Sequence, residues 1–349
     1  MKKQDYQAQR YFKLNENLKK ILSDLPEFCI SFFRGIENTT SILTRVNYAY
    51  ELRLFFSFLC LELKLLHYET IKDITVDDLK MLNSEHIEKY LEYSNCYYDG
   101  EGLVTNSEYG KSRKLSAIRS FFKYYFRKGI LPSNVASLVQ LPKIHEKPII
   151  RLEADEVANL LDMVETGEDL SPAQLCYHKF NKTRDTAILT LFLGTGIRIS
   201  ELVGINLADI DFRVNGFKVT RKGGSQAVLY FGSEPEKALK AYLEERKIIT
   251  PQQGHEDALF LSLQKRRISV RSVQNLVVKY ARIISPLKKI SPHKLRSTYG
   301  TMLYQETGDI YLVADVLGHK DVNTTKKHYA AISDEKRRMA AKAVKLRDE

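Results

Sequence analysis

The sequence predicts a mostly α-helical protein of two domains, an all-α domain followed by an α+β domain with a small antiparallel sheet. Three observations lead to this prediction. Apolar residues recur at helical spacing through most of the 349 residues. Two prolines, Pro142 and Pro148, frame an extended segment near the middle of the chain. Two β-like runs, 217–220 and 227–231, flank the Gly223–Gly224 pair that a tight hairpin favours.

The composition is that of a globular protein, with 44% hydrophobic residues. The sequence contains no apolar run long enough to span a membrane and no apolar leader, so we expect a cytoplasmic protein without membrane insertion. The cysteines are scattered without a C-x-x-C pair, so we expect reduced thiols and neither a zinc site nor a disulfide frame. They are Cys29, Cys60, Cys96 and Cys176.

Positive charge is concentrated in two segments of a chain whose net charge is +11. Residues 258–305 contain ten Lys or Arg and no acidic residue, and residues 111–128 contain seven and none. The alternative interpretation is two solvated helix faces, but such faces normally mix both signs. The distribution therefore favours a polyanion held by both domains.

The first half of the chain is predicted to consist of helices. A helical region covers residues 1–38 with a break at Pro26, and a threonine cap at 39–40 opens a long helix to about residue 66. A further helix begins near residue 83. The segment 95–110, with its Gly, Asn and Ser residues, is expected to be a loop.

The next helix, over 111–128, is amphipathic, with an apolar stripe and cations that project elsewhere. A basic solvated face is one interpretation. A second interpretation, favoured by the family resemblance given below, is a helix laid along DNA, with its cations on phosphates. These cations are Lys114, Arg119, Lys123 and Arg127.

In the second half, an apolar helix ends at Gly194 and the next begins at Arg198, with Glu201 three residues on and on the same face. Taken alone, such a pair is most often an ordinary surface ion pair. Lys222 stands just before the predicted hairpin turn. A later helix over 269–284 carries three cations away from its apolar stripe, as in a helix that faces a DNA groove. They are Arg271, Lys279 and Arg282.

The stretch from Ser291 to Tyr329 concentrates residues suited to binding a phosphate. Ser291 and Pro292 predict a helix start, and His293 and Arg296, three apart, share a face near the positive end of that helix. A histidine, an arginine and helix N–H groups together form a phosphate or oxyanion receptor. A short apolar helix over 310–317 should then end at Gly318 in a left-handed conformation, with His319 next and Tyr329 ten residues later.

H-x-x-R, L-G-H and a tyrosine in this order, together with G-T-G-I-R-I-S-E-L and T-R-K-G-G upstream, resemble the tyrosine recombinases of the phage integrase family. F-N-K-T-R-D-T-A-I-L followed by T-R-K-G-G is most similar to the XerS branch of Xer recombinases. One departure is Ser297, where the family often has a histidine. The resemblance implies a SAM-like core DNA-binding domain over 1–142, a linker over 143–150, a catalytic domain over 151–332 and a tail helix for subunit contacts over 333–349.

The resemblance also implies a role for each matching residue. Tyr329 is the nucleophile, and His293 is its base or hydrogen-bond partner. Arg198 and Arg296 bind the scissile phosphate. The remaining implied roles are orientation of an arginine by Glu201, protonation of the leaving oxygen by Lys222 and a hydrogen bond to the phosphate from His319. Lysine is preferred over the neighbouring Arg221 because only lysine can give up a proton. No metal or nucleotide motif is present, so we expect no cofactor.

The expected partner is double-stranded DNA with a specific site, bound by a dimer and brought together as a tetramer. A cell-division protein or a DNA-bending accessory protein is a further expected partner, and the location implied is the bacterial nucleoid. The leading function is site-specific recombination that resolves chromosome dimers. Three alternatives stay open: a mobile-element integrase, a type IB topoisomerase-like enzyme, and a non-catalytic DNA-binding relative.

Overall fold

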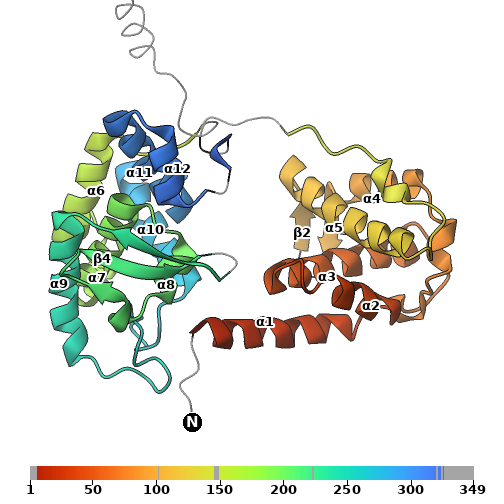
Figure 1. The fold of residues 1–349 in the computed structure, drawn as a ribbon, viewed down its shortest axis with the longest axis horizontal. Helices are drawn as coiled ribbons and strands as arrows, with labels where there is room; N and C mark the ends of the chain where they lie inside the picture. The colour runs from red at the N-terminus through yellow and green to blue at the C-terminus, as the bar shows by residue number, and fades with distance from the viewer. Residues whose placement is uncertain are drawn as a thin grey trace, which may run out of the picture. The chain divides into compact units, whose positions relative to one another are not determined.

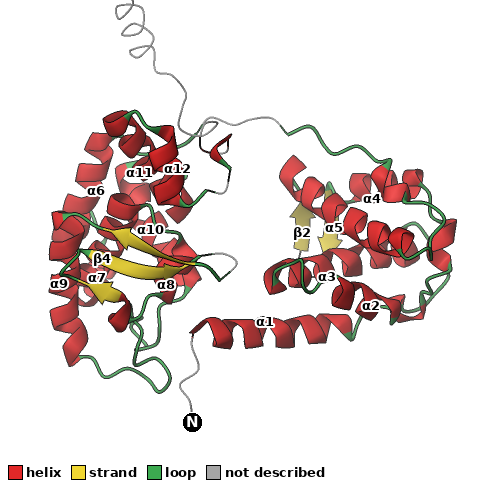
Figure 2. Ribbon diagram, in the orientation of Figure 1, coloured by secondary structure: helices red, strands yellow, loops and turns green. Residues whose placement is uncertain are grey.

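The chain divides into two compact units, Met1–Lys147 and Pro148–Glu349, and each is described by itself (Figure 1). The computed structural model describes residues 6–100, 102–144, 149–221, 224–319, 321–323 and 325. Both units are mainly helical with small antiparallel sheets, so the predicted fold class is confirmed (Figure 2). Within the described ranges, none of the helices has the length and hydropathy needed to span a membrane.

The first unit is built from five α-helices and one β-hairpin within its described residues. In chain order these elements are α1 Tyr6–Leu22, α2 Phe28–Gly35, α3 Ile42–Ser57, α4 Ser84–Tyr93, β1 Cys96–Asp99, β2 Gly102–Thr105 and α5 Glu108–Arg127. Short 3-10 turns occupy Ile71–Asp73, Asp78–Met81 and Val135–Ser137.

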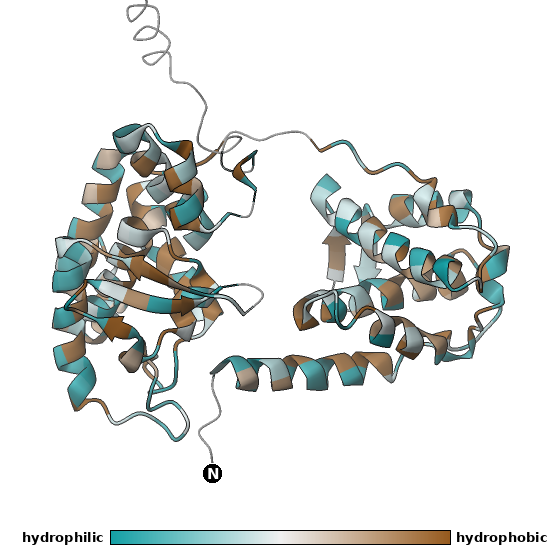
Figure 3. Ribbon diagram, in the orientation of Figure 1, coloured by the Kyte–Doolittle hydropathy of each residue, from teal (hydrophilic) through white to brown (hydrophobic). Residues whose placement is uncertain are grey.

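The core of the first unit is aromatic. Phe32 of α2 meets Phe121 of α5 edge to face with ring centroids 5.2 Å apart, and Phe55 of α3 meets Tyr90 of α4 at 5.1 Å. All four rings are fully buried. Edge-to-face rings contribute about 0.5–1.5 kcal/mol per pair beyond the area they bury. The apolar stripes that predicted these helices therefore meet in one core, and hydrophobic and hydrophilic residues alternate along the helices around it (Figure 3).

Three local expectations for the first unit are wrong. The segment expected to be a loop contains the hairpin β1–β2, in which Tyr98 pairs with Leu103. The long helix α3 is capped by Ser41, whose Oγ accepts from the Thr44 N–H at 3.2 Å, and not by the preceding threonines. It also ends at Ser57 and continues only as a π-helical turn, Phe58–Glu62.

The second unit arranges its helices around α7. Its elements are α6 Ala154–Thr166, α7 Pro172–Thr195, α8 Ile199–Gly204, β3 Ile210–Asp211, β4 Gly216–Thr220, β5 Gln226–Tyr230, α9 Ser233–Ile248, α10 Val270–Ile284, α11 Pro292–Thr307 and α12 Ile310–Leu317, with a 3-10 turn at Leu207–Asp209. Helix α7 contacts α6, α9 and α11.

A buried polar network joins α7 to α10. The Tyr280 hydroxyl donates to the Asp185 carboxylate at 3.1 Å and lies 3.2 Å from Nδ1 of His178. Burial and the adjacent Asp185 raise the pKa of Tyr280 well above its ordinary value. Burial lowers the pKa of His178, so this histidine is neutral at pH 7. The network gives the Tyr280 hydroxyl, the Asp185 carboxylate and Nδ1 of His178 polar partners between the two helices, while Nε2 of His178 is buried without a hydrogen-bond partner among the described residues.

Strands β3, β4 and β5 form one antiparallel sheet, and the hairpin predicted around Gly223–Gly224 is its β4–β5 pair. Thr220 pairs with Gln226, and the Arg221 N–H donates to the Ser225 carbonyl at 2.7 Å to close the turn. Gly224 has a φ of +87°, a conformation that glycine adopts without strain. The turn is therefore held at its base on both strands.

The last two helices begin and end close to where the sequence places them. Helix α11 begins at Pro292 and ends before Gly308, and α12 ends before Gly318, both glycines having left-handed φ values of +68° and +64°. The Ser291 side chain, expected to cap α11, makes no capping hydrogen bond. Asp309 caps α12 by accepting from the N–H groups of Tyr311 and Leu312 at 2.8 and 3.1 Å.

Candidate active site

Four of the six predicted catalytic residues lie within the described part of the chain, and all four belong to the second unit. Arg198 stands at the N-terminus of α8, His293 and Arg296 lie in the first turns of α11, and His319 follows α12. Lys222 and Tyr329 lie outside the described residues, as does the tail 333–349.

Arg296 links the loop after α7 to the end of α12 through hydrogen bonds. Its Nη1 donates to the Gly196 carbonyl at 2.5 Å, and its Nη2 donates to the Leu317 carbonyl at the end of α12. The residue is only 4% exposed. A guanidinium is suited to this position because its planar donors can reach two acceptors at once.

Gly196 makes this close approach possible. It ends α7 with a φ of +61°, and a Cβ atom added there would lie 2.4 Å from the Tyr299 ring and 2.8 Å from the Leu317 side chain. Any larger residue would both strain the backbone and push α11 and α12 away. The G-T-G motif thus brings the loop before Arg198 against the helices that carry Arg296 and His319.

Arg198 is held by hydrogen bonds to Glu201 and to the Gly318 carbonyl, which directly follows α12. Its Nη1 donates to Glu201 Oε1 at 2.9 Å, its backbone N–H donates to Oε2 at 3.0 Å, and its Nη2 donates to the Gly318 carbonyl at 2.9 Å. The Glu201 side chain is 3% exposed, whereas that of Arg198 is 30% exposed. The ion pair is thus no ordinary surface pair: a buried carboxylate holds a guanidinium that still faces solvent.

His319 is fixed at the same point of the structure. Its backbone N–H donates to the Ala314 carbonyl at 2.9 Å, and its Nδ1 lies 2.8 Å from the Thr325 hydroxyl. It directly follows Gly318, whose carbonyl binds Arg198. The structure therefore gathers Arg198, Arg296 and His319 around the end of α12, and exposed His293 lies one helical turn from Arg296.

This arrangement presents cations and hydrogen-bond donors. Within the described ranges, no three His, Cys, Asp or Glu residues are grouped so as to hold a metal ion. Clustered guanidiniums and an imidazole suit the non-bridging oxygens of a phosphate, whose negative charge grows during phosphoryl transfer.

The sequence model of the phage integrase family matches residues 150–336, which include every one of the six predicted positions. The chain belongs to the phage integrase family. It is a tyrosine recombinase, an enzyme that cleaves and rejoins DNA with a tyrosine nucleophile, so the resemblance seen in the sequence is confirmed.

Known members of this family match most of the recombinase. The tyrosine recombinase XerC of Caldanaerobacter subterraneus subsp. tengcongensis is 33% identical over 84% of this chain and 79% of its own. The tyrosine recombinase XerS of Lactococcus lactis subsp. cremoris is 29% identical over 93% of this chain and 97% of its own. The fold is similar to the XerH recombinase in its post-cleavage complex, with a TM-score of 0.64, 18% identity, and coverage of 86% and 79%.

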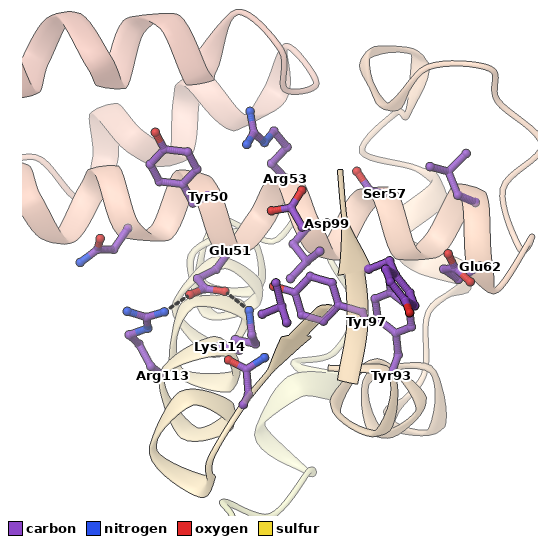
Figure 4. Close-up of a pocket in the computed structure, with 16 residues that line it drawn as sticks. Tyr50, Glu51, Arg53, Ser57, Glu62, Tyr93, Tyr97, Asp99, Arg113 and Lys114 are labelled. Carbon is purple, nitrogen blue, oxygen red and sulfur yellow. Dashed lines mark hydrogen bonds and ion pairs between the residues drawn. The ribbon is translucent and has the colours of Figure 1, made fainter. Parts of the chain in front are cut away.

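Of the cations predicted to contact DNA, Lys114 lies elsewhere than expected. It is 3% exposed, its Nζ lies 2.7 Å from the Glu51 carboxylate, and it also lies over the Tyr97 ring (Figure 4). Arg113, which is exposed, binds the other oxygen of Glu51 at 2.8 Å. The expectation that Lys114 projects from the recombinase is therefore wrong, because Glu51 on α3 draws it into the core.

Arg119 and Lys279 are also held inside their own units. Arg119 donates to the Ala136 carbonyl at 3.2 Å and to the Val139 carbonyl, which fixes the segment after α5. Lys279 lies 3.7 Å from the Asp185 carboxylate and 3.8 Å from the centre of the Tyr280 ring. Burial lowers the pKa of Lys279, although Asp185 opposes this shift. Both cations, which were predicted to contact DNA, therefore bind groups of their own unit instead of projecting freely.

The other four predicted cations are exposed and have no ion pair within the described residues. They are Lys123 and Arg127 on α5 and Arg271 and Arg282 on α10. Net charge along the sequence could not separate these from the internal ones, because the carboxylates and carbonyls that bind the internal cations lie on other segments.

Arg221, to which the sequence pattern assigned no role, lies at the same centre. Its Nη2 donates to the Val316 carbonyl at 3.3 Å, one residue before the carbonyl that Arg296 binds. The available signal was its place beside Lys222, but lysine was preferred there on chemical grounds.

Proposed function

We propose that this recombinase is a Xer-type site-specific enzyme that resolves chromosome dimers through a 3′-phosphotyrosyl intermediate. The observation that carries the chemistry is the convergence of Arg198, Arg296 and His319 on the end of α12. The similarity to XerS over nearly the full length of both chains supports the chromosomal role. In this proposal the first unit binds core DNA and the second cuts it.

The proposed reaction moves one phosphoryl group twice. The Tyr329 oxygen attacks the scissile phosphorus and loses its proton to His293, since a tyrosine of pKa about 10 needs a base. The bond from phosphorus to the 5′ oxygen breaks, and Lys222 gives that oxygen a proton. Arg198 and Arg296 stabilise the charge on the non-bridging oxygens, with a hydrogen bond from His319. The 5′-hydroxyl of another strand then reverses these steps, so no ATP is consumed.

The test uses covalent trapping, without metal or nucleotide. The cognate site is first recovered by trapping adducts on a pool of genomic DNA fragments, and is then built into a nicked suicide duplex. We expect an SDS-resistant protein–DNA adduct in EDTA. An adduct that forms only with added Mg²⁺ would contradict the metal-free route, and equal reaction on any duplex would favour a topoisomerase-like enzyme. A recovered site inside a mobile element would favour an integrase.

A second prediction separates the exposed cations from the internal ones. Arg282→Ala is expected to weaken DNA binding and to lower the slope of log affinity against log salt by about 0.9, the value for one lost phosphate contact. Lys279→Ala, on the same helix, is expected to leave that slope unchanged, because Lys279 faces Asp185. Fluorescence anisotropy across a salt series measures both. Equal slopes for the two variants would remove Arg282 from the DNA interface.

A third prediction concerns assembly, which the proposal takes to be a dimer on each site and a tetramer at synapsis. The tail 333–349 has a narrow apolar edge, and a short helix of this kind needs a docking partner to be stable. We propose that it docks on a neighbouring subunit. Deleting 336–349 should preserve binding of one subunit to a half-site, while cooperative binding of the second subunit falls at least about tenfold in band-shift titrations, a loss of about 1.4 kcal/mol. Unchanged cooperativity would rule out docking in trans.

A further inference from the structure

Three arginines donate hydrogen bonds to three successive carbonyls at the end of α12. Arg221 donates to Val316, Arg296 to Leu317 and Arg198 to Gly318. The last carbonyls of a helix have no intrahelical donors and carry the negative end of the helix dipole, so cations are favoured there. Two of these arginines already have a place in the proposed reaction, whereas Arg221 has none.

Arg221 fits against α12 more closely than a single hydrogen bond requires. A Cβ atom added to Gly318 would lie 2.2 Å from Arg221 Nη1 and 2.4 Å from its Cζ. The guanidinium therefore packs directly on the Gly318 backbone, the point that also binds Arg198 and precedes His319. Only a glycine leaves room for it, and the φ of +64° at this position favours glycine as well.

The position of Arg221 has a cost for stability. Its Nε is buried and has no hydrogen-bond partner among the described residues. A buried donor left without a partner costs about 1–3 kcal/mol, so local stability alone does not explain this placement. Such a group calls for a functional explanation.

Arg221 also has a fixed relation to the proposed general acid. It is the residue directly before Lys222 in the sequence. Its N–H donates to Ser225 at 2.7 Å and its carbonyl accepts from Gly224 at 3.0 Å, which ties its backbone to the β4–β5 turn. Its side chain thus joins that turn to the end of α12.

We propose that Arg221 is a positioning residue that acts through Lys222: by fixing the β4–β5 turn to Val316 and Gly318, it sets where Lys222 delivers its proton. This inference rests on the proposed function. It predicts that changing Arg221 slows cleavage when the leaving oxygen must be protonated. The cleavage rate should fall much less when the leaving group needs no proton. Val316 and Gly318 serve as the anchor and take no part in the chemistry through their side chains.

The experiment compares two leaving groups in the full-length enzyme. One nicked suicide duplex carries the ordinary 5′ oxygen at the scissile bond, and the other carries sulfur there, which departs without a proton. Lys222→Ala is expected to slow cleavage of the oxygen substrate about 10²–10⁴-fold and the sulfur substrate much less. Arg221→Ala should show the same pattern with a smaller loss, about 10–100-fold on oxygen and within about threefold on sulfur.

Three further variants secure the conclusion. Arg221→Lys keeps one donor for Val316 but loses the planar packing on Gly318, so we expect its cleavage of the oxygen substrate to be slowed less than that of Arg221→Ala. This variant tests the proposal even if Arg221→Ala fails to fold. The double variant with Lys222→Ala should be no slower than Lys222→Ala alone, since both act in one step. Arg213→Ala removes an exposed arginine paired only with Asp211 within the described chain and should cleave both substrates normally.

The outcomes distinguish this inference from the proposed function. If Arg221 variants slow both substrates equally, while Lys222→Ala keeps its preference for sulfur, the positioning role is wrong and the function stands. If Lys222→Ala also slows both equally, Lys222 is not the acid and the inference falls with it. If the unmodified enzyme forms no adduct, the proposed function itself is wrong.

Discussion

Replacing Tyr329 with phenylalanine is expected to abolish the covalent adduct while leaving DNA binding within about twofold, a difference of about 0.4 kcal/mol. The change removes only the oxygen that would attack phosphorus. Loss of a nucleophile typically lowers turnover by about 10⁴–10⁶-fold, which places cleavage below detection on a suicide duplex. Adduct formation is measured on denaturing gels and binding by anisotropy.

The matched control is Tyr311→Phe. Tyr311 lies in the first turn of α12 and is 71% exposed, and the proposal gives it no chemical role. It should form the adduct at the normal rate. An adduct that persists in Tyr329→Phe would assign the nucleophile to another residue, and mapping the DNA-linked peptide would identify it.

Arg296→Ala is expected to have the second largest effect, on both catalysis and stability. Losing one donor to a developing oxyanion costs about 10²–10³ in rate. The same change leaves the Gly196 and Leu317 carbonyls without the donor they share. Hydrogen bonds to charged groups contribute about 1.5–3 kcal/mol each, so the melting temperature should fall by several degrees.

Arg198→Ala is the comparison. Its side chain is 30% exposed, but the Glu201 carboxylate that it binds is only 3% exposed and would lose its cation. We therefore expect a comparable loss of cleavage and also a loss of stability, because a buried carboxylate without its partner is costly. Cleavage rates and thermal unfolding curves measure the two effects. If Arg296→Ala cleaved DNA at more than about a tenth of the normal rate, its proposed contact with the phosphate would be wrong.

Local patterns were sufficient to predict the helices and the turn glycines. The apolar stripe of α5 and the left-handed glycines after α11 and α12 depend on a few neighbouring residues, so the sequence shows them directly. The hairpin β1–β2 was missed although Tyr-Tyr and Leu-Val are separated by the four residues Asp-Gly-Glu-Gly, and a short glycine-containing spacer of this kind is a hairpin signal. The surrounding polar residues favoured a loop instead.

What could not be predicted depends on contacts between distant residues. Lys114 lies next to the apolar stripe of α5, and only Glu51, 63 residues earlier, decides that it is buried. Motifs named Arg198, His293, Arg296 and His319, but no local pattern reveals that two of these arginines, with Arg221, bind the carbonyls of α12. Those carbonyls lie 120, 21 and 95 residues from Arg198, Arg296 and Arg221.

These separations have a consequence for the order in which the enzyme is made and folded. Contacts across 95–120 residues close only after the intervening chain has been synthesised and collapsed, because loop closure costs entropy before the contact forms. In a nascent chain whose α12 is still on the ribosome, Arg198 lacks the Gly318 carbonyl that it binds in the folded enzyme. The set of three arginines on the end of α12 is therefore complete only once the last helices have been made.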